Sequence, residues 1–493
     1  MRIRLEHVAL AVLLIGLFWL RIGLSTSVAT LDYGAYQTVR QVEHIQATGQ
    51  PLRVDPLSVT GNERLGSPVV QYLLAALTWA TPLMYKILPN LFMVLLLIPV
   101  YFLARNLTKS VPASIASVVL AGSGPFVFAA YLNDPSPVPI AAFLLLAILA
   151  TLHNPARHLY PIVGLTLLLT FVHPLVFILV LVLATIIALL RLEGFTVDRR
   201  IGELFLFTLF LATWFHVIVY KRALLAEGLR VVWKNLPASY ASAAFGNPTF
   251  LTLLYGLGVV TFLFGVLGAY HALFERRERI SLSVIGALLV TSIAVLLRIV
   301  EIRIGLMLLT ILLSVMAAHG LHISAGYLAR TKVSWSRYPL AALLIILFAI
   351  TALLPALSNA RTALANAPGP EELAAYEAAR MALPDDAIVL TTLREASAFQ
   401  YYTQRTTLTD DDFVLVHKGD EIVADITAVY TSRFVTALAS KAEKLGITHI
   451  FFSPDAARTY GRDELTIDAS GCIRAFRLTG VATLYETGCA EAR

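Results

Sequence analysis

The sequence predicts a polytopic α-helical membrane bundle followed by a soluble C-terminal α/β domain. The first observation is composition: 58% of the 493 residues are hydrophobic and only 14% are charged, whereas a soluble domain usually carries about 25% charged residues. The second is that the apolar residues gather in runs long enough to cross a bilayer, which takes about 20 residues. The third is a break near Asn359, after which the chain becomes polar and acidic.

About eleven apolar runs are long enough to form spanning helices, and their backbones must be helical because the bilayer core holds no water to pair them. The runs lie near residues 8–25, 89–104, 111–131, 136–152, 159–172, 175–190, 202–220, 250–271, 281–297, 304–323 and 338–357. Two short runs on either side of His173-Pro174 predict a hairpin with that pair at its tip. The runs together predict a multi-pass protein of the plasma membrane.

The distribution of Lys and Arg predicts which side of the membrane each loop occupies. If residues 68–85 lie on the outer surface instead of crossing, every short inner loop carries Lys or Arg, and the outer turns around Asp134 and His173 carry neither. Because short cytoplasmic loops collect positive charge, we expect a cytoplasmic N-terminus and an extracytoplasmic C-terminal domain. We expect membrane lipid as a partner and no nucleic acid.

Composition also predicts the domain boundary. Residues 1–359 form a membrane domain whose outer loop, 26–88, carries amphipathic helices, and residues 360–493 form an extracytoplasmic domain. Short β-like runs alternate with helical ones in that second domain, which predicts an α/β fold. Cys472 and Cys489 flank a predicted hairpin, so a disulfide between them is plausible in an oxidising compartment, and two unpaired thiols are the alternative.

Two acidic residues follow apolar helices on the predicted outer face. Asp32 lies a few residues beyond the first helix, and Asp134 lies in FAAYLNDPSPVPI, at the end of a later one. Paired carboxylates can hold a divalent cation such as Mg²⁺ or Mn²⁺, and one of them can take a proton from an acceptor hydroxyl. Each residue also suits a helix start, where Asp is common, so both interpretations stay open.

Arg298, Glu301 and Arg303 lie together in LLRIVEIRIGLML, between two apolar runs. Arg suits phosphate because its planar fork makes two parallel hydrogen bonds, so this segment predicts a phosphate-binding site at the outer mouth of the bundle. The alternative is that the two Arg side chains extend to the membrane surface and pair with Glu301. His173 is a further candidate for substrate binding, although a His at a hairpin tip is more often a turn residue.

Several catalytic and transport motifs are absent from the sequence. It has no Walker loop, no GxGxxG with an acidic partner, no HExxH and no GxSxG, which argues against an ATP-driven pump or a nucleotide enzyme. No Asp, Glu or Lys lies in the middle of an apolar run, so an ion-coupled transporter lacks its usual relay. The run Asp410-Asp411-Asp412 resembles a metal motif, but consecutive carboxylates do not converge easily on one ion, and we interpret it as a solvated turn.

The layout resembles that of the GT-C glycosyltransferases, which include the catalytic subunit of oligosaccharyltransferase and the protein O-mannosyltransferases. The resemblance lies in an Asp on the first outer loop, an amphipathic helix that ends in Gly-x-Pro, and the following GSPVVQYLLAAL. Asp32 matches the family's catalytic Asp, Asp134 its second acidic residue, and Arg303 its phosphate-binding Arg. The WWDYG signature of oligosaccharyltransferase is missing, and REASAFQYYTQRTTLTDDDF stands in its place, as in archaeal GT-C-like proteins.

The resemblance implies a GT-C-like bundle that transfers a sugar, with inversion, from a polyprenyl-phosphate donor such as a dolichyl-phosphate sugar. The acceptor would be a protein, a glycan or a lipid on the outer face. Arg303 would bind the donor phosphate and Asp32 would activate the acceptor, with Asp134 positioning the acceptor or a cation. A lipid-linked-sugar flippase or other transporter is one alternative, and a non-catalytic scaffold with an outer binding domain is another.

Overall fold

The computed structural model describes residues 5–61, 63–79, 81–276, 278–330, 337–465 and 473–488. The chain divides into two compact units. The bundle unit comprises Met1–Val28, Leu83–Ile218 and Ala243–Leu364, and the sheet unit comprises Ala29–Pro82, Val219–Ser242 and Ala365–Arg493. Most of the first outer loop therefore clusters with the C-terminal residues, while the predicted boundary between residues 359 and 360 stays a prediction.

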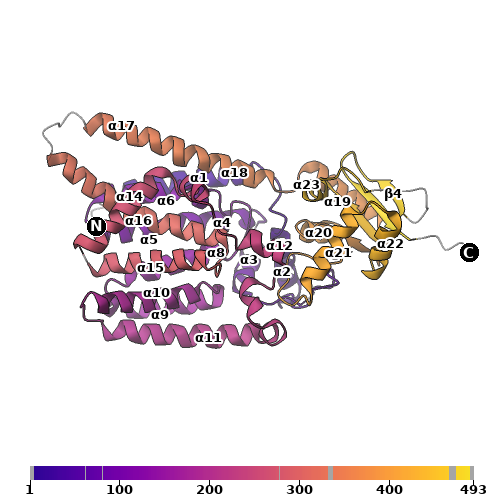
Figure 1. The fold of residues 1–493 in the computed structure, drawn as a ribbon, viewed down its shortest axis with the longest axis horizontal. Helices are drawn as coiled ribbons and strands as arrows, with labels where there is room; N and C mark the ends of the chain where they lie inside the picture. Colours follow the sequence, from indigo (N-terminus) through magenta and orange to yellow (C-terminus); the bar gives the residue numbers. More distant parts are fainter. Residues whose placement is uncertain are drawn as a thin grey trace, which may run out of the picture. The chain divides into compact units, whose positions relative to one another are not determined.

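The bundle unit is built from apolar helices, many of which lie side by side (Figure 1). They are α1 (Leu5–Thr26), α4 (Met84–Leu95), α5 (Leu97–Thr108), α6 (Val111–Gly122), α7 (Pro125–Phe128), α8 (Val138–Thr151), α9 (Pro155–Val172), α10 (Val176–Leu192), α11 (Arg199–Glu227), α13 (Phe250–Leu257), α14 (Val259–His271), η2 (Ala272–Arg276), α15 (Arg279–Leu296), α16 (Ile302–Arg330), α17 (Arg337–Phe348), η4 (Ala349–Leu353) and α18 (Leu354–Ala365). The last residues of α11 and α18 belong to the sheet unit.

Among the described residues, seven helices are long and apolar enough to cross a membrane, or up to eight if the bent pair α13–α14 is one span. The chain is therefore a multi-pass membrane protein, but the predicted number of about eleven spans is not confirmed. The runs predicted at 111–131, 136–152 and 175–190 contain helices of 12, 14 and 17 residues. The first of these is shortened because α6 ends before Ser123-Gly124 and α7 begins after it.

Residues 68–85, predicted to lie on the membrane surface, contain the helix α3 (Val69–Thr78) of 10 residues. At about 1.5 Å per residue such a helix rises about 15 Å, half the thickness of the hydrocarbon core, so α3 alone is too short to cross.

Close helix packing places α16 at the centre of the bundle unit. Residues 304–320 of this helix are almost all buried. Its neighbour α14 approaches through glycines, because a Cβ at Gly268 would overlap the Met316 carbonyl oxygen and one at Gly320 would overlap the Phe264 carbonyl oxygen. Small residues let spanning helices approach in this way. The N-terminus of α16, which follows the predicted phosphate-binding segment, is thus attached to a rigid core.

The sheet unit contains a five-stranded sheet in the order β2-β1-β3-β5-β4, which confirms the predicted α/β class. The strands are β1 (Ile388–Leu390), β2 (Thr406–Thr407), β3 (His449–Phe452), β4 (Ile473–Arg477) and β5 (Thr483–Thr487). The first two pair in parallel with each other and β1 also pairs in parallel with β3, whereas β5 pairs antiparallel with both β3 and β4.

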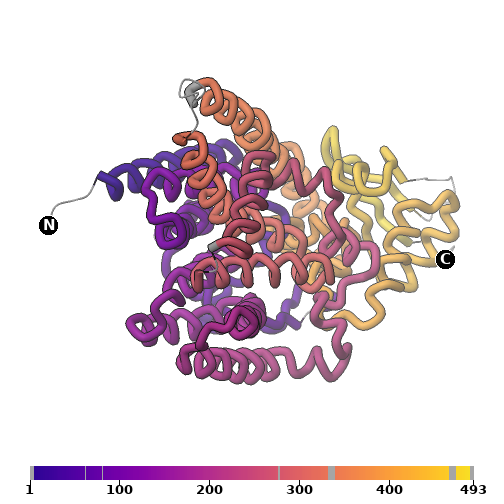
Figure 2. The backbone as a smooth tube through the Cα atoms, turned by 60° about the vertical axis from the view of Figure 1, so that its left-hand side comes forward, coloured from indigo at the N-terminus to yellow at the C-terminus, as the bar shows by residue number. Residues whose placement is uncertain are grey.

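The described residues of the sheet unit also form helices around the sheet or beside it, and the described chain is helical over most of its length (Figure 2). These helices are α2 (Ala35–Thr48), α3, η1 (Gly228–Trp233), α12 (Ala238–Ala244), α19 (Pro370–Ala382), α20 (Ala396–Thr403), α21 (Gly419–Thr431), α22 (Val435–Lys444) and α23 (Pro454–Tyr460). The predicted C-terminal hairpin is present as β4 and β5. Cys472 and Cys489 lie outside the described residues, so their disulfide stays a prediction.

Backbone hydrogen bonds explain why the first outer loop belongs to the sheet unit. The amide of Val59 donates to the Thr407 carbonyl at 3.0 Å, and the amide of Thr407 donates to the Leu57 carbonyl at 3.0 Å. The loop thus pairs with β2 at the edge of the sheet and covers polar groups that an edge strand otherwise leaves open.

Candidate active site

Hydrogen bonds to the C-terminal part of the sheet unit hold the segment that carries Asp32. The Thr30 hydroxyl donates to the Pro368 carbonyl at 2.8 Å, and the Tyr33 hydroxyl donates to Glu372 Oε2 at 2.7 Å. Burial and the Glu372 carboxylate raise the pKa of Tyr33, so this hydroxyl stays a neutral donor. Asp32 itself is half-buried. The residues on both sides of Asp32 are therefore fixed by hydrogen bonds within the sheet unit.

Asp32 precedes the N-cap position of α2. The N-cap residue of α2 is Gly34, with no side-chain capping bond. Asp32 lies two residues earlier and contributes its backbone carbonyl, which accepts from the Ala35 amide at 3.0 Å. The role of the Asp32 carboxylate stays a prediction.

A buried ionic network joins α2 to the run of aspartates. Both Arg40 and Arg64 donate to the carboxylate of Asp55 at 2.9 Å, and Arg64 also pairs with Asp410. Burial opposes ionisation of Asp55, but the two guanidinium groups lower its pKa. Asp410 is fully buried and Asp412 lies 3.3 Å from Arg64. The prediction of a solvated turn is therefore wrong for Asp410, which is buried in an ion pair with Arg64.

Asp411, by contrast, is exposed and faces the start of α2. A Cβ at Gly34 would lie 3.4 Å from Asp411 Oδ2. Arg394 lies near the same turn, with its guanidinium carbon 5.0 Å from the centre of the Tyr33 ring. Sequence analysis did not single out Asp411 or Arg394 as neighbours of Asp32, because more than 350 residues separate them from it along the chain.

The bundle unit brings two other predicted residues together. A carboxylate oxygen of Asp134 lies 3.7 Å from a guanidinium nitrogen of Arg303, and the two side chains are 26% and 47% exposed. The guanidinium carbon also lies 4.5 Å from the centre of the Tyr131 ring. The N-cap residue of α8 is Pro137, three residues after Asp134.

Arg303 lies in the first turn of α16, where the helix dipole opposes a positive charge by about 0.3–1 kcal/mol. The Asp134 carboxylate and the Tyr131 ring offset that cost. A helix N-terminus with an adjacent guanidinium is also a favourable environment for an anion. The arrangement can therefore bind a phosphate while Asp134 orients the Arg303 side chain.

The structure places the remaining predicted site residues as follows. Nδ1 of His173 accepts from the Leu175 amide at 3.1 Å, which accounts for it as a turn residue. Arg298 has a left-handed backbone, φ 58°, after the end of α15. The Glu301 carbonyl accepts from the Gly305 amide at 2.9 Å at the start of α16. Roles of these three side chains in substrate binding stay predictions.

A divalent cation at Asp32 and Asp134 stays a prediction. No group of three or more His, Cys, Asp or Glu side chains that could hold a metal ion occurs in the described part of the chain. We therefore assign no step to a metal.

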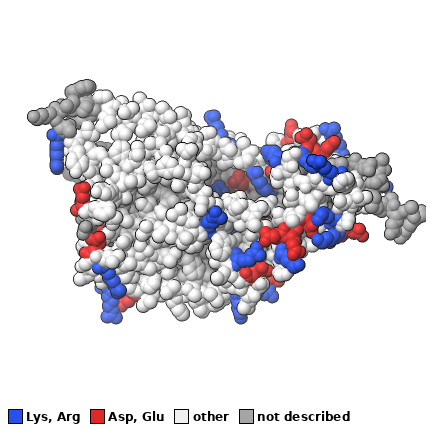
Figure 3. All heavy atoms as spheres, viewed as in Figure 1, with Lys and Arg blue, Asp and Glu red and all other residues white. Residues whose placement is uncertain are grey.

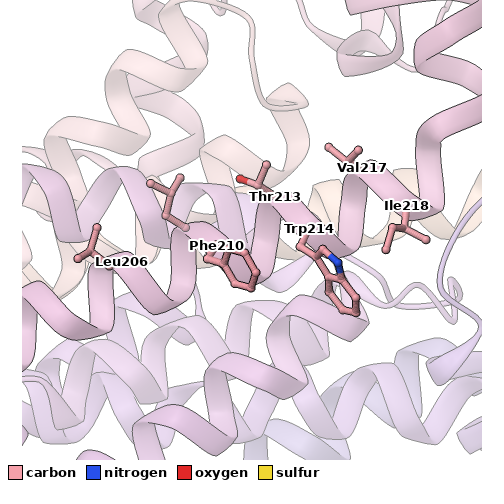
Figure 4. A pocket seen from close by; sticks show the side chains of 7 residues that line it. Leu206, Phe210, Thr213, Trp214, Val217 and Ile218 are labelled. Atoms are coloured by element: carbon pink, nitrogen blue, oxygen red, sulfur yellow. The ribbon is translucent and has the colours of Figure 1, made fainter.

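An open apolar groove of about 750 Å³ follows one face of α11 (Figure 4). Its lining is apolar apart from the Thr213 hydroxyl and the Trp214 indole N–H, and it consists of Leu206, Leu209, Phe210, Thr213, Trp214, Val217 and Ile218. Hydrocarbon chains suit such a surface, because contact between them removes apolar area from water.

Solved structures with a similar fold are glycosyltransferases. The oligosaccharyltransferase of Archaeoglobus fulgidus in the apo form aligns with 97% of this chain and 74% of its own, at a TM-score of 0.66 and 14% identity. ArnT from Cupriavidus metallidurans bound to undecaprenyl phosphate aligns with 97% of both chains, at a TM-score of 0.56 and 12% identity. The chain has the GT-C glycosyltransferase fold.

The same fold is found in the mycobacterial arabinofuranosyltransferase AftD, which aligns with 99% of this chain but only 40% of its own, at a TM-score of 0.56 and 14% identity. Another structure of the Archaeoglobus protein, AglB, holds an inhibitory peptide and a dolichol-phosphate, with a TM-score of 0.67 and 15% identity over 89% of this chain and 69% of its own. At the level of sequence, no family model and no curated protein matches the chain.

Proposed function

We propose that the protein is a membrane glycosyltransferase that moves a sugar from a polyprenyl-phosphate donor to an acceptor on the outer face of the membrane. The GT-C fold, present over nearly the whole chain, carries this proposal. Two structures with that fold hold a dolichol-phosphate or undecaprenyl phosphate, which supports a lipid phosphate as the donor's leaving group. The inhibitory peptide in one of them supports a peptide among the candidate acceptors, besides a glycan or a lipid.

We assign the base to Asp32 and the phosphate grip to Arg303. The Asp32 carboxylate takes the proton of an acceptor hydroxyl or orients that group. The acceptor oxygen then attacks the anomeric carbon, and the bond from that carbon to the phosphate oxygen breaks, leaving its electron pair on the phosphate. The Arg303 guanidinium stabilises that developing charge. One displacement inverts the configuration at the anomeric carbon.

The proposed orientation places the N-terminus in the cytoplasm and the C-terminal domain outside, in the plasma membrane. Basic residues in the short inner loops support it. The donor reaches the site sideways from the outer leaflet, because its tail stays in lipid. The side chains of the α11 groove suit such a tail.

The test uses purified full-length protein in lipid vesicles with radiolabelled polyprenyl-phosphate hexoses and a panel of peptide, glycan and lipid acceptors. We expect transfer by the wild type and at least a hundredfold loss in Asp32→Asn, since loss of a general base costs about 10²–10⁴-fold. Asp463→Asn is the matched control, because that residue is exposed in the sheet unit and should transfer sugar at the wild-type rate.

Two results would overturn the proposal. One is full activity in Asp32→Asn. The other is a folded wild type that moves a fluorescent lipid-linked sugar across the vesicle membrane but transfers none of it, which would identify a flippase instead.

A further inference from the structure

Helix α1 carries a buried arginine whose partners are backbone carbonyls of the segment before Asp134. Arg21 is 2% exposed. Its Nε donates to Asn90 Oδ1 at 3.0 Å, and one terminal nitrogen donates to the Ala130 carbonyl at 2.7 Å. The other terminal nitrogen donates to the carbonyls of Val127 and Phe128, at 3.1 and 2.5 Å. One guanidinium thus binds three carbonyls within four residues.

Two neighbouring side chains continue this network along the same segment. The amide nitrogen of Asn90, on α4, donates to the Leu132 carbonyl at 2.8 Å. The Ser25 hydroxyl, on α1, lies 2.8 Å from the same carbonyl and 2.6 Å from Asn133 Oδ1. Lys86 donates in turn to the Ser25 carbonyl at 2.9 Å. Side chains of α1 and α4 therefore bind four backbone carbonyls of this segment, those of Val127, Phe128, Ala130 and Leu132.

The segment needs these donors because its backbone is irregular. Val127 and Phe128 end the short helix α7, so their carbonyls lack partners in the next turn. Tyr131 has a left-handed backbone, φ 55°, which is costly for an aromatic residue and persists only where its surroundings enforce it. In a membrane bundle, irregular backbone is tolerated only where protein groups or enclosed water pair it.

The same segment carries the groups that contact Arg303. The ring of Tyr131, between the bound carbonyls of Ala130 and Leu132, lies below the Arg303 guanidinium, and Asp134 follows two residues after Leu132. A change in the path of this backbone therefore moves both partners of Arg303 at once. The positions of Arg21 and of the Asp134 carboxylate are coupled through a few covalent bonds and hydrogen bonds.

We propose that Arg21 is a positioning residue for the Asp134–Arg303 pair. Ser25 and Asn90 contribute to the same positioning, because both donate to the Leu132 carbonyl. The N–H groups of the planar Arg21 guanidinium donate to carbonyls that lie in several directions. The ammonium of a Lys is a single nitrogen and cannot reach all of these carbonyls in the same geometry. The consequence for catalysis rests on the proposed function, because it requires Arg303 to bind the donor phosphate. The consequence for the conformation of residues 127–134 does not.

The conformational test places a thiol at Ser136, a half-buried residue in the same connection that leaves Asp134 unchanged. Full-length Ser136→Cys protein in lipid vesicles is labelled with a membrane-impermeant maleimide, and protein without this substitution gives the background from the two native cysteines. We expect Arg21→Lys to change the labelling rate several-fold, and Ser25→Ala, a milder change, to shift it in the same direction. Ile186→Ala, a buried truncation in α10, is the matched control and should leave the rate unchanged.

The catalytic test measures kcat and KM for the donor with the same variants. We expect Arg21→Lys to lower kcat about a hundredfold, because a misplacement of about 1 Å can cost that much, and Ile186→Ala to keep the wild-type kcat. Labelling at the wild-type rate in both Arg21→Lys and Ser25→Ala would overturn the proposal. So would wild-type kcat in Arg21→Lys, in an enzyme that transfers sugar. If the wild type transfers no sugar, the proposed function fails while the labelling rates still decide the role of Arg21.

Discussion

The segment that carries Asp32 and the loop that carries Asp134 are both irregular backbone, but side chains of different kinds hold them. In the sheet unit one bond runs from Thr30 to the Pro368 carbonyl, and the others run between side chains: Tyr33 donates to Glu372, and Arg64 is the centre of a buried ionic network. In the bundle unit they run from side chains to backbone carbonyls, with Arg21 as the main donor. The first arrangement depends on groups that titrate, whereas the second pairs a permanent cation with neutral acceptors.

The environments explain this difference. Charged side chains of both signs cover the sheet unit, whereas the visible face of the bundle unit carries few (Figure 3). A carboxylate can stay ionised near water at little cost, but an anion in hydrocarbon is expensive. The bundle unit instead uses neutral carbonyls to stabilise Arg21. We therefore expect pH and charge removal to affect the Asp32 side more than the Asp134 side.

The largest expected effect comes from removal of the central cation of the buried network. Arg64→Met leaves Asp55 and Asp410 buried without this partner, which should destabilise the sheet unit by about 3–5 kcal/mol. Arg222→Met is the matched control, since Arg222 pairs with Glu63 at an exposed site, where a pair contributes about 0–1 kcal/mol. Thermal unfolding of the full-length protein in detergent measures both. Equal unfolding temperatures for the two variants would show that the network does not hold the Asp32 segment.

The next effect is a pH dependence confined to the sheet unit. Burial and nearby Asp455 raise the pKa of Glu395 to about 8, against about 4.3 in an unfolded chain. The folded protein therefore keeps a proton that the unfolded chain releases, and this group's contribution to stability is full below pH 4 and lost as the pH rises towards 8. Inside that window the free energy of unfolding falls by up to about 1.4 kcal/mol per pH unit because of this group.

Glu395→Gln removes this titration, so its unfolding temperature should fall less than that of the wild type between pH 5 and 8. Other groups titrate in the same range, and the difference between variant and wild type isolates Glu395. Glu464→Gln, at an exposed position, should follow the wild type at every pH. If the unfolding temperature of Glu395→Gln fell with pH as steeply as that of the wild type, Glu395 would not be the titrating group.

Sequence patterns predicted the parts of the fold that depend on composition and local periodicity. They gave the apolar bundle, the α/β class of the second part and its C-terminal hairpin. The number of spans is not confirmed, because hydropathy averages over a window and does not detect a break at Ser123-Gly124 or the 96° bend between α13 and α14. A left-handed glycine such as Gly258, φ 80°, has no signature in an apolar average.

The candidate site was predictable only where a residue type was itself unusual. Asp134 and Arg303 are charged residues beside apolar runs, and the structure pairs them. Arg21 gave the same signal, an ionisable residue within the run 8–25, but its partners are carbonyls more than 100 residues away. Asp410 was misinterpreted for a similar reason, because its cation, Arg64, lies 346 residues away along the chain. Neither a carbonyl nor a distant partner has a local sequence pattern.

The smallest expected effect is a loss of stability caused by a substitution in the bundle unit. Asn90→Ala leaves Arg21 Nε and the Leu132 carbonyl each without one buried partner, which costs about 1–3 kcal/mol. Ser292→Ala removes only a hydroxyl that bonds to the Leu288 carbonyl of its own helix and should stay within about 0.5 kcal/mol of the wild type. Because neither Asn90 nor the carbonyl titrates, the difference between these two variants should be the same at pH 5 and pH 8. If it varied with pH as strongly as the Glu395 contribution, the bundle side would also depend on a titrating group, and the contrast between the two segments would fail.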